Sequence, residues 1–170
     1  YDSLTSLPNR RLFTEQLDLL LRLAKRNKEM LALVFLDLDN FKIVNDAGGH
    51  AAGDEVLRRV ADIIATRIRL TDNLYRFGGD EFVVLLPETD PTGGFVLAEK
   101  IRQGAAELGE TGMGRSATLS VGIVSYPRDG RTANELLVSA DQAMYAAKQG
   151  GRNRVCTELD PVPEPPHPLD

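Results

Sequence analysis

The chain has 170 residues, enough for one domain with a buried core, and its apolar (42%) and charged (26%) fractions are typical of globular proteins. The net charge is −5 and lysine and arginine are dispersed, which argues against a nucleic-acid partner. No apolar run reaches the ~20 residues needed to cross a bilayer, so we expect no direct membrane contact. A single cysteine excludes an internal disulfide and fits a cytoplasmic protein, or the cytoplasmic part of a membrane-bound one.

The spacing of apolar residues predicts helices that alternate with short strands. In chain order we expect a helix over 10–24, a buried strand over 31–36, a short helix over 41–46, a glycine turn over 47–50, a helix ending near 69, strands over 74–77 and 82–86, a helix over 97–108, a strand over 117–124, a helix ending at 150 and an edge strand over 154–156. This order predicts an α/β (α+β) sandwich, in which helices flank a central, mixed, mostly antiparallel five-stranded sheet.

We expect a single domain over residues 1–157. From Pro161 onward, five prolines without apolar periodicity predict a disordered tail or linker over 158–170. The sequence begins at Tyr1 without methionine, inside what reads as a motif, and is interpreted as a piece of a longer protein.

Two glycines and two adjacent carboxylates lie between the short strands, where Gly78-Gly79 precedes Asp80 and Glu81. A Gly-Gly pair between strands predicts a tight hairpin with backbone angles that only glycine adopts cheaply. Neighbouring carboxylates at a fixed tip suggest a bound cation, and the alternative is an ordinary solvated turn.

Asp37 ends the first buried strand, directly before a helix. Backbone N–H groups at the helix start, around residues 40–42, would form an anion site, and a carboxylate beside them suits a metal-bound triphosphate. Alternatively, Asp39 or Asn40 caps the helix, the role we favour for Asp39, and Asp37 is a solvated loop acid. One acid is enough to cap the helix, so the cap does not explain why a second one is present. We therefore expect Asp37 and the hairpin acids to share a divalent ion.

These residues belong to an ordered series of motifs that resembles a GGDEF domain of the diguanylate cyclase family over about residues 2–157. The motifs are Asp2–Arg11, Asp37–Lys42, Asn45-Asp46, Gly49-His50, Gly53-Asp54, Gly78–Phe82, Ser120–Ile123 and Ala146–Lys148 with Arg152. Several motifs in order at compatible spacings make the resemblance specific.

The resemblance implies a fold similar to the nucleotidyl-cyclase and polymerase palm. It implies that two GTP molecules condense into cyclic di-GMP and two pyrophosphates in a homodimer with one GTP per protomer. Mg²⁺ or Mn²⁺ is the implied cofactor. An upstream sensor domain is the implied partner, and the proline-rich tail leaves room for a phosphodiesterase domain. The alternative is a non-catalytic module that binds GTP or cyclic di-GMP.

The resemblance also implies site residues. The implied metal ligands are Asp37, the carbonyl of Leu38, Asp80 and Glu81, and one of the last two is the base. The implied substrate contacts are Asn45 and Asp54 for guanine, Phe41 and His50 lining the pocket, and Lys42, Lys148 and Arg152 for phosphate. Taken singly, each has an ordinary alternative: a turn at Asn45-Asp46, an N-cap at Asp54, and helix-end cations at Lys148 and Arg152.

Arg69 and Asp72 are three residues apart, with five residues between Asp72 and Gly78. At this offset the pair resembles the family's inhibitory product site, in which an arginine stacks on guanine and an aspartate accepts from its opposite edge. A second basic residue from the next helix, Lys100 or Arg102, is expected. Two departures stand out: Ser6 replaces a usual glycine, and Gly48 replaces a large residue, which should loosen packing beside the guanine pocket.

Overall fold

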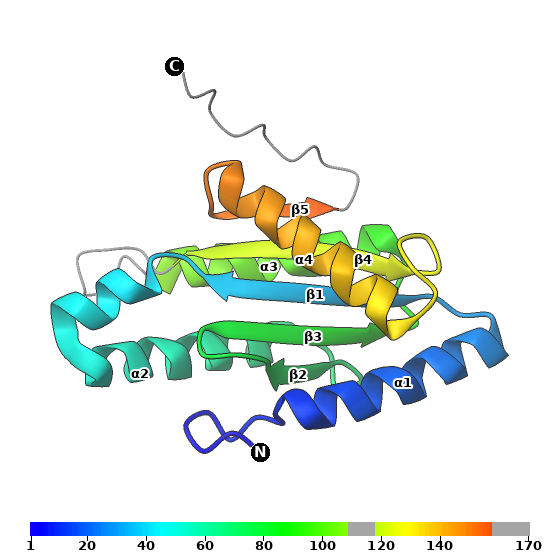
Figure 1. Cartoon of the computed structure of the whole chain (residues 1–170), viewed down its shortest axis with the longest axis horizontal. Coiled ribbons are helices and arrows are strands. Elements are labelled where there is room, and N and C mark those ends of the chain that lie inside the picture. Colours follow the sequence, from blue (N-terminus) through cyan, green and yellow to red (C-terminus); the bar gives the residue numbers. More distant parts are fainter. Residues whose placement is uncertain (109–117, 158–170) are drawn as a thin grey trace.

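The computed structural model describes residues 1–108 and 118–157, so the predicted tail over 158–170 lies outside the described part. The helices and strands, in chain order, are α1 (Arg10–Asn27), β1 (Leu31–Leu38), α2 (Phe41–Arg67), β2 (Asn73–Arg76), β3 (Glu81–Pro87), α3 (Pro91–Leu108), β4 (Leu119–Tyr126), α4 (Ala133–Gln149) and β5 (Arg154–Thr157) (Figure 1).

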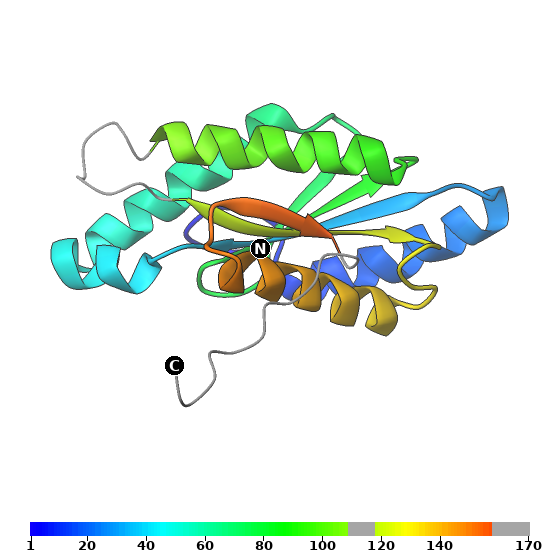
Figure 2. The ribbon, with the colours of Figure 1, turned by 90° about the horizontal axis from the view of Figure 1, so that it is seen from above.

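The strands form one open, five-stranded sheet in the order β2-β3-β1-β4-β5. β1 is antiparallel to both β3 and β4, β2 is antiparallel to β3, and β4 and β5 are parallel. Helices α1 and α4 cover one face of the sheet, and α2 and α3 cover the other (Figure 2). The predicted mixed, mostly antiparallel five-stranded sandwich is confirmed.

Strand β1 lies at the centre of the sheet, and all eight of its residues are buried. Its side chains alternate between two cores. Val34 and Leu36 pack with α2 and α3, whereas Leu33 and Phe35 pack with α1 and α4. Burial on both faces explains why this strand reads as a continuous apolar run.

The N-terminus of α1 is fixed by a cap, because the Asn9 side chain accepts a hydrogen bond from the backbone N–H of Leu12 at 3.2 Å. Thr132 and Glu135 form a capping box at the start of α4. Over the described residues, no helix combines the length and the hydropathy needed to cross a membrane.

Candidate active site

The predicted acids meet at one end of the sheet, where β1 ends and β3 begins, on the left in Figure 1. Asp37 pairs with Glu81 in the strand register, and the N–H of Leu38 donates to the carbonyl of Asp80 at 3.1 Å. The carboxylate of Asp80 lies near enough to Asp37 for its negative charge to raise the pKa of Asp37. The fold therefore brings together two acids that are 43 positions apart in the sequence.

Asp37 is a buried acid, with only 8% of its side chain exposed. One carboxylate oxygen, Oδ2, pairs with the ammonium of Lys148, and the other, Oδ1, is buried without a hydrogen-bond partner among the described residues. Burial raises the pKa of Asp37 to about 7, the Lys148 hydrogen bond opposes this rise, and the charge of Asp80 adds to it. The alternative interpretation of Asp37 as a solvated loop acid is therefore wrong.

This acid pair fits a hard divalent cation. A buried carboxylate oxygen without a donor gains most from a positive charge, and Mg²⁺ binds one or two carboxylates together with water and phosphate oxygens. Within the described ranges no group of three His, Cys, Asp or Glu side chains is preassembled as a metal site. The remaining ligands would therefore be backbone, water or nucleotide oxygens.

The hairpin between β2 and β3 differs from the expected turn. Among the glycines of residues 1–108 and 118–157, those with positive φ are Gly49 and Gly151, so the expectation of special glycine angles at Gly78 and Gly79 is wrong. A Cβ at Gly78 would lie 2.9 Å from Oε1 of Glu81, so the glycine leaves room for the end of that side chain.

The hairpin is tied to the N-terminal turn by an ion pair that the sequence did not reveal. The guanidinium of Arg76 donates to both oxygens of Asp2 at 2.9 and 3.0 Å and to the carbonyl of Gly79 at 2.7 Å. Asp2 also accepts from the backbone and hydroxyl of Thr5. Asp2, in the first motif of the chain, thus helps to hold the tip of the β2–β3 hairpin, which carries Asp80.

Glu81 is half-buried at the start of β3. Burial raises its pKa, and the negative charges of Asp80 and Asp141 raise it further, whereas Lys148 and Arg10 act in the opposite direction. A carboxylate with a raised pKa accepts a proton more readily than an ordinary glutamate.

The predicted guanine residues lie on two helical segments that meet at Gly49. The α2 segment continues as helix on both sides of this residue, but Gly49 itself has φ 79° and ψ 178°, which breaks the helix into two arms. Asn45 on the first arm lies against Gly53 on the second, since a Cβ on Gly53 would be 1.9 Å from Oδ1 of Asn45. The next residue, half-buried Asp54, follows at the same junction.

The structure also shows where the other residues expected near the guanine base lie at this junction. Phe41 packs against Gly53: a ring carbon of Phe41 lies 3.2 Å from where a Cβ on Gly53 would be. His50 follows Gly49, where the helix is broken, and its side chain is exposed. Asp54 lies inside the second arm, so its expected N-cap alternative is wrong. A Cβ on Gly48 would be 2.6 Å from that of Ala52, so glycine allows close packing rather than loosening it.

The start of α2 keeps its N-terminal amides available for an anion. Asn40, at φ 59°, occupies the cap position but its side chain makes no capping hydrogen bond. Its Oδ1 instead accepts from the guanidinium of Arg152 at 3.1 Å. Lys42 is exposed on the first turn. Arg152 and the helix start are therefore neighbours, while Lys148 reaches Asp37.

Asp39 does not cap the helix, contrary to the favoured interpretation. Its buried carboxylate accepts from the hydroxyls of Thr118 at 2.7 Å and Ser120 at 2.6 Å and from the N–H of Asn153 at 3.0 Å. Asp39 thus joins β1 to β4 and to the loop before β5.

Arg69 and Asp72 are paired at the other end of the sheet. The Asp72 side chain is fully buried and accepts from the backbone N–H, Nε and Nη2 of Arg69, whereas 54% of the Arg69 side chain is exposed. In this conformation Asp72 orients the arginine rather than presenting its own carboxylate. Arg102 bonds Glu99 and Asn153, whereas Lys100 is exposed and lines a cavity together with Arg67.

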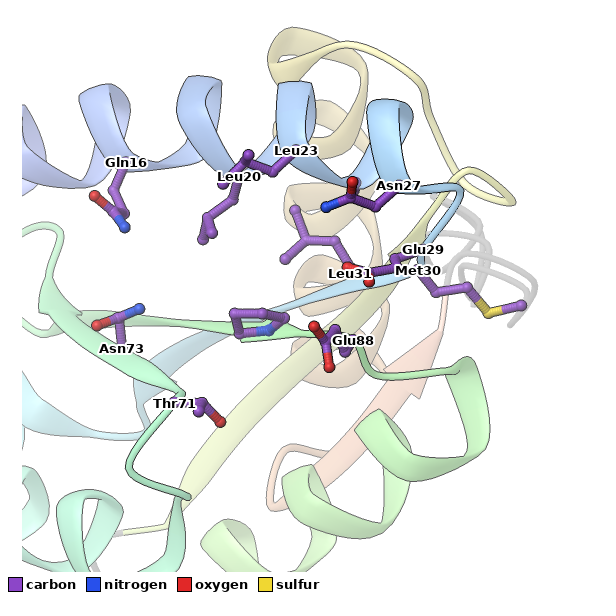
Figure 3. A pocket seen from close by; sticks show the side chains of 12 residues that line it. Gln16, Leu20, Leu23, Asn27, Glu29, Met30, Leu31, Thr71, Asn73 and Glu88 are labelled. Atoms are coloured by element: carbon purple, nitrogen blue, oxygen red, sulfur yellow. The ribbon is translucent and has the colours of Figure 1, made fainter.

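A cavity of about 350 Å³ lies between α1 and the β2 edge, and its lining includes Leu20, Leu31, Thr71, Pro87 and Glu88 (Figure 3). Leu31 pairs with Pro87 at the end of β1 away from Asp37. Leu31 and Asp37 are six positions apart along β1, about 20 Å, so this cavity is not part of the acid site.

Comparison with known proteins agrees with these motifs. The family model described as diguanylate cyclase, GGDEF domain, matches residues 1–154. The bifunctional diguanylate cyclase/cyclic di-GMP phosphodiesterase MucR of Pseudomonas aeruginosa is 42% identical over 157 residues, which cover 92% of this chain but 23% of MucR. The chain thus spans a small part of that relative.

Two solved structures are similar over nearly their whole length. One comprises the GGDEF domain of TpbB (YfiN) from Pseudomonas aeruginosa, with TM-score 0.86, 39% identity, and coverage of 93% of this chain and 94% of that one. The other is the GGDEF domain of DgcB from Caulobacter crescentus in complex with c-di-GMP, with TM-score 0.86, 32% identity, and coverage of 94% and 95%.

Proposed function

The chain belongs to the GGDEF family of diguanylate cyclase domains, and on this premise we propose that it condenses two GTP molecules into cyclic di-GMP and two pyrophosphates. The observation that carries the proposal is the buried oxygen of Asp37 that has no hydrogen-bond partner among the described residues; it lies near Asp80 and close to a helix start without a side-chain cap from that part of the chain. This arrangement suits a metal-bound triphosphate.

We assign the metal ligands to Asp37, Asp80 and the carbonyl of Leu38, with Glu81 at the edge of the site. Bound Mg²⁺ or Mn²⁺ would neutralise phosphate charge and favour ionisation of the attacking hydroxyl. The amides at the start of α2, together with Lys42 and Arg152, would hold the phosphates, and Lys148 lies within the same group of side chains.

The guanine base would bind at the junction of the two arms of α2. Asn45 and Asp54 supply an amide and a carboxylate, and the carboxylate can accept from N1–H and the exocyclic amine of guanine, donors that adenine lacks. Phe41 and His50 would line this pocket.

The reaction joins two nucleotides held by two copies of the chain. The 3′-oxygen of one GTP attacks the α-phosphorus of the other, a new P–O bond forms, the bond to the oxygen bridging to the β-phosphorus breaks, and pyrophosphate leaves. Glu81, whose pKa is raised, is suited to take the hydroxyl proton. A two-fold product made from identical substrates suits a two-fold homodimer, and an upstream sensor domain would control the encounter.

Product would also bind at Arg69 and inhibit the enzyme. Support comes from the half-exposed guanidinium, which Asp72, the Pro87 carbonyl and Thr89 hold in place while its outer surface stays open for stacking on guanine. Arg69→Ala should then remove product inhibition and leave the initial rate unchanged.

The experiment is incubation with GTP and Mg²⁺ and identification of products by mass, with Asp80→Ala as the inactive control. A cyclic dinucleotide formed only by the unaltered chain supports the proposal. Binding of GTP or cyclic di-GMP by a folded chain that forms no product would instead indicate a non-catalytic module. Asp54→Ser should relax the preference for GTP over ATP, and an unchanged preference would contradict the guanine assignment.

A further inference from the structure

The loop between α4 and β5 has an unusual backbone conformation beside the proposed triphosphate site. Gly151, Arg152 and Asn153 follow one another with φ of 117°, 64° and 44°. Residues that carry a side chain adopt such positive φ angles only where the surrounding structure holds them there, and they gather at functional sites. The conformation of Arg152 and Asn153 therefore depends on contacts from outside the loop.

A buried carboxylate supplies one of these contacts. Asp39 leaves only 3% of its surface exposed, and its Oδ2 accepts a hydrogen bond from the backbone N–H of Asn153 at 3.0 Å. The same oxygen accepts from the hydroxyl of Thr118 at 2.7 Å, and Oδ1 accepts from the hydroxyl of Ser120 at 2.6 Å. Because Thr118 and Ser120 lie at the start of β4, the sheet fixes the carboxylate, and the carboxylate in turn fixes the loop.

The fixed loop directs Arg152 at the start of α2. The backbone N–H of Arg152 donates to the carbonyl of Ala147 at 2.9 Å, which secures the loop to the end of α4. Its guanidinium donates to Oδ1 of Asn40 at 3.1 Å, and Asn40 occupies the cap position of α2. An arginine that is held in place before a ligand arrives loses less side-chain freedom on binding, so preorganisation raises affinity.

We propose that Asp39 is a positioning residue for the triphosphate: through the N–H of Asn153 it holds the loop that sets the guanidinium of Arg152 beside the amides of α2. Both oxygens of Asp39 are bonded to the sheet and the loop, so Asp39 acts through Arg152 and does not itself contact nucleotide. The inference rests on the proposed function in one respect only, the assignment of Arg152 as a phosphate contact.

Binding of a GTP analogue tests the proposal without turnover. The probe is GTP with a methylene bridge between the α- and β-phosphates, which cannot release pyrophosphate, and its dissociation constant with Mg²⁺ is measured by calorimetry. Asp39→Ala removes the acceptor of the hydrogen bond, and Asn153→Pro removes the donor and excludes positive φ at an exposed position. Each should weaken binding about tenfold, as should Arg152→Ala.

Two conservative changes should retain binding. In Asp39→Asn the amide oxygen can still accept from the N–H of Asn153, while the hydroxyl of Ser120 turns to accept from the amide NH₂. Asn153→Gly keeps the N–H and allows positive φ at little cost. Both should bind the analogue within about threefold of the unaltered chain, although Asp39→Asn lowers the stability of the fold. Tenfold weaker binding in both conservative variants would contradict the proposal.

Ser120→Ala separates positioning from general weakening of the fold. This change removes the donor to Oδ1 of Asp39 and leaves Oδ2 bonded to Asn153, so it should lower the stability and leave the dissociation constant nearly unchanged. An equal loss of affinity in Ser120→Ala and Asp39→Ala would overturn the assignment. If Asp39→Ala does not fold, Asn153→Pro and Asn153→Gly carry the same comparison.

Double variants show whether Asp39 acts through Arg152. When Asp39→Ala or Asn153→Pro is added to Arg152→Ala, binding should weaken by less than about twofold further, because the group to be positioned is already absent. If the separate losses multiply in full, the inference is wrong, and product formation by the unaltered chain would still support the proposed function. If the losses do not multiply but the unaltered chain forms no cyclic dinucleotide, the inference stands and the proposed function fails. A chain that does not bind the analogue overturns both.

Discussion

Replacing Asp37 with asparagine should stabilise the metal-free protein at neutral pH, although it removes a group needed for the proposed reaction. The wild-type side chain is buried, one oxygen lacks a partner among the described residues, and the pKa is raised from 3.8 to about 7. Asparagine has nearly the same shape and carries no charge to desolvate. Proposed function and stability of the fold therefore oppose each other at this position.

The magnitude follows from the raised pKa. Each tenfold change in proton affinity corresponds to ~1.4 kcal/mol, so ionised Asp37 costs the metal-free fold up to ~4 kcal/mol above pH 7. The substitution also removes the ion pair with Lys148, whose partly exposed ammonium can return to water, a loss of ~1 kcal/mol. A net gain of ~3 kcal/mol would raise the Tm of a domain of this size by about 9 °C.

The pH dependence has a definite sign. Between pH 3.8 and about 7 the unfolded chain has released the proton that folded Asp37 still holds, so wild-type stability falls as the pH rises through this window. Asparagine does not titrate. The Tm advantage of Asp37→Asn should therefore grow from pH 4 to pH 7 and level off above it.

The assay is thermal unfolding in EDTA, with Asp39→Asn as the matched control. Asp39 is also buried and lies two residues away, but its carboxylate accepts hydrogen bonds from Thr118, Ser120 and Asn153, so its substitution should cost about 1–3 kcal/mol. Added Mg²⁺ should raise the Tm of wild type more than that of Asp37→Asn. A destabilised Asp37→Asn, or an advantage independent of pH, would refute the reasoning.

Three further substitutions test local geometry. Gly53→Ala introduces a Cβ 1.9 Å from Oδ1 of Asn45 and should raise the KM for GTP about tenfold while kcat changes less; an unchanged KM would contradict the placement of Asn45 in the pocket. Asp2→Ala removes both oxygens that hold Arg76 and should lower the free energy of unfolding by about 1–3 kcal/mol in urea denaturation, and a neutral result would show that the ion pair is dispensable. Gly122→Ala puts a Cβ 2.6 Å from the α4 backbone and should destabilise the fold by about 1–3 kcal/mol, which the same denaturation curves would show or disprove.

The sequence predicted the sheet and the position of Asp37 because both depend on a simple pattern. A continuous apolar run marks a strand buried on two faces, and the acid at its end must leave the core at the sheet edge. The meeting of Asp37 with Asp80 depended on strand order, which periodicity does not encode. The resemblance supplied that proximity, and the β1–β3 register confirms it.

Other features were not predictable from local patterns. The Gly-Gly hairpin was expected to need left-handed angles, yet Gly78 makes room for the Glu81 side chain, a contact decided by packing. Asp39 was assigned to a cap because cap preferences are local, but its hydrogen-bond donors come from β4 and the loop before β5, far along the chain. The pair between Asp2 and Arg76 spans 74 positions and leaves no signal in spacing.

The contact between Lys148 and Asp37 has a consequence for how ligands would arrive. The lysine ammonium is a tethered counter-ion that already occupies the carboxylate. A divalent ion that takes over this carboxylate releases the ammonium, and the side chain can reach only nearby oxygens, those of a triphosphate at the start of α2. Loading of metal and of nucleotide would then assist each other through one shared charge, so the domain would respond to the coincidence of both ligands more strongly than to either alone.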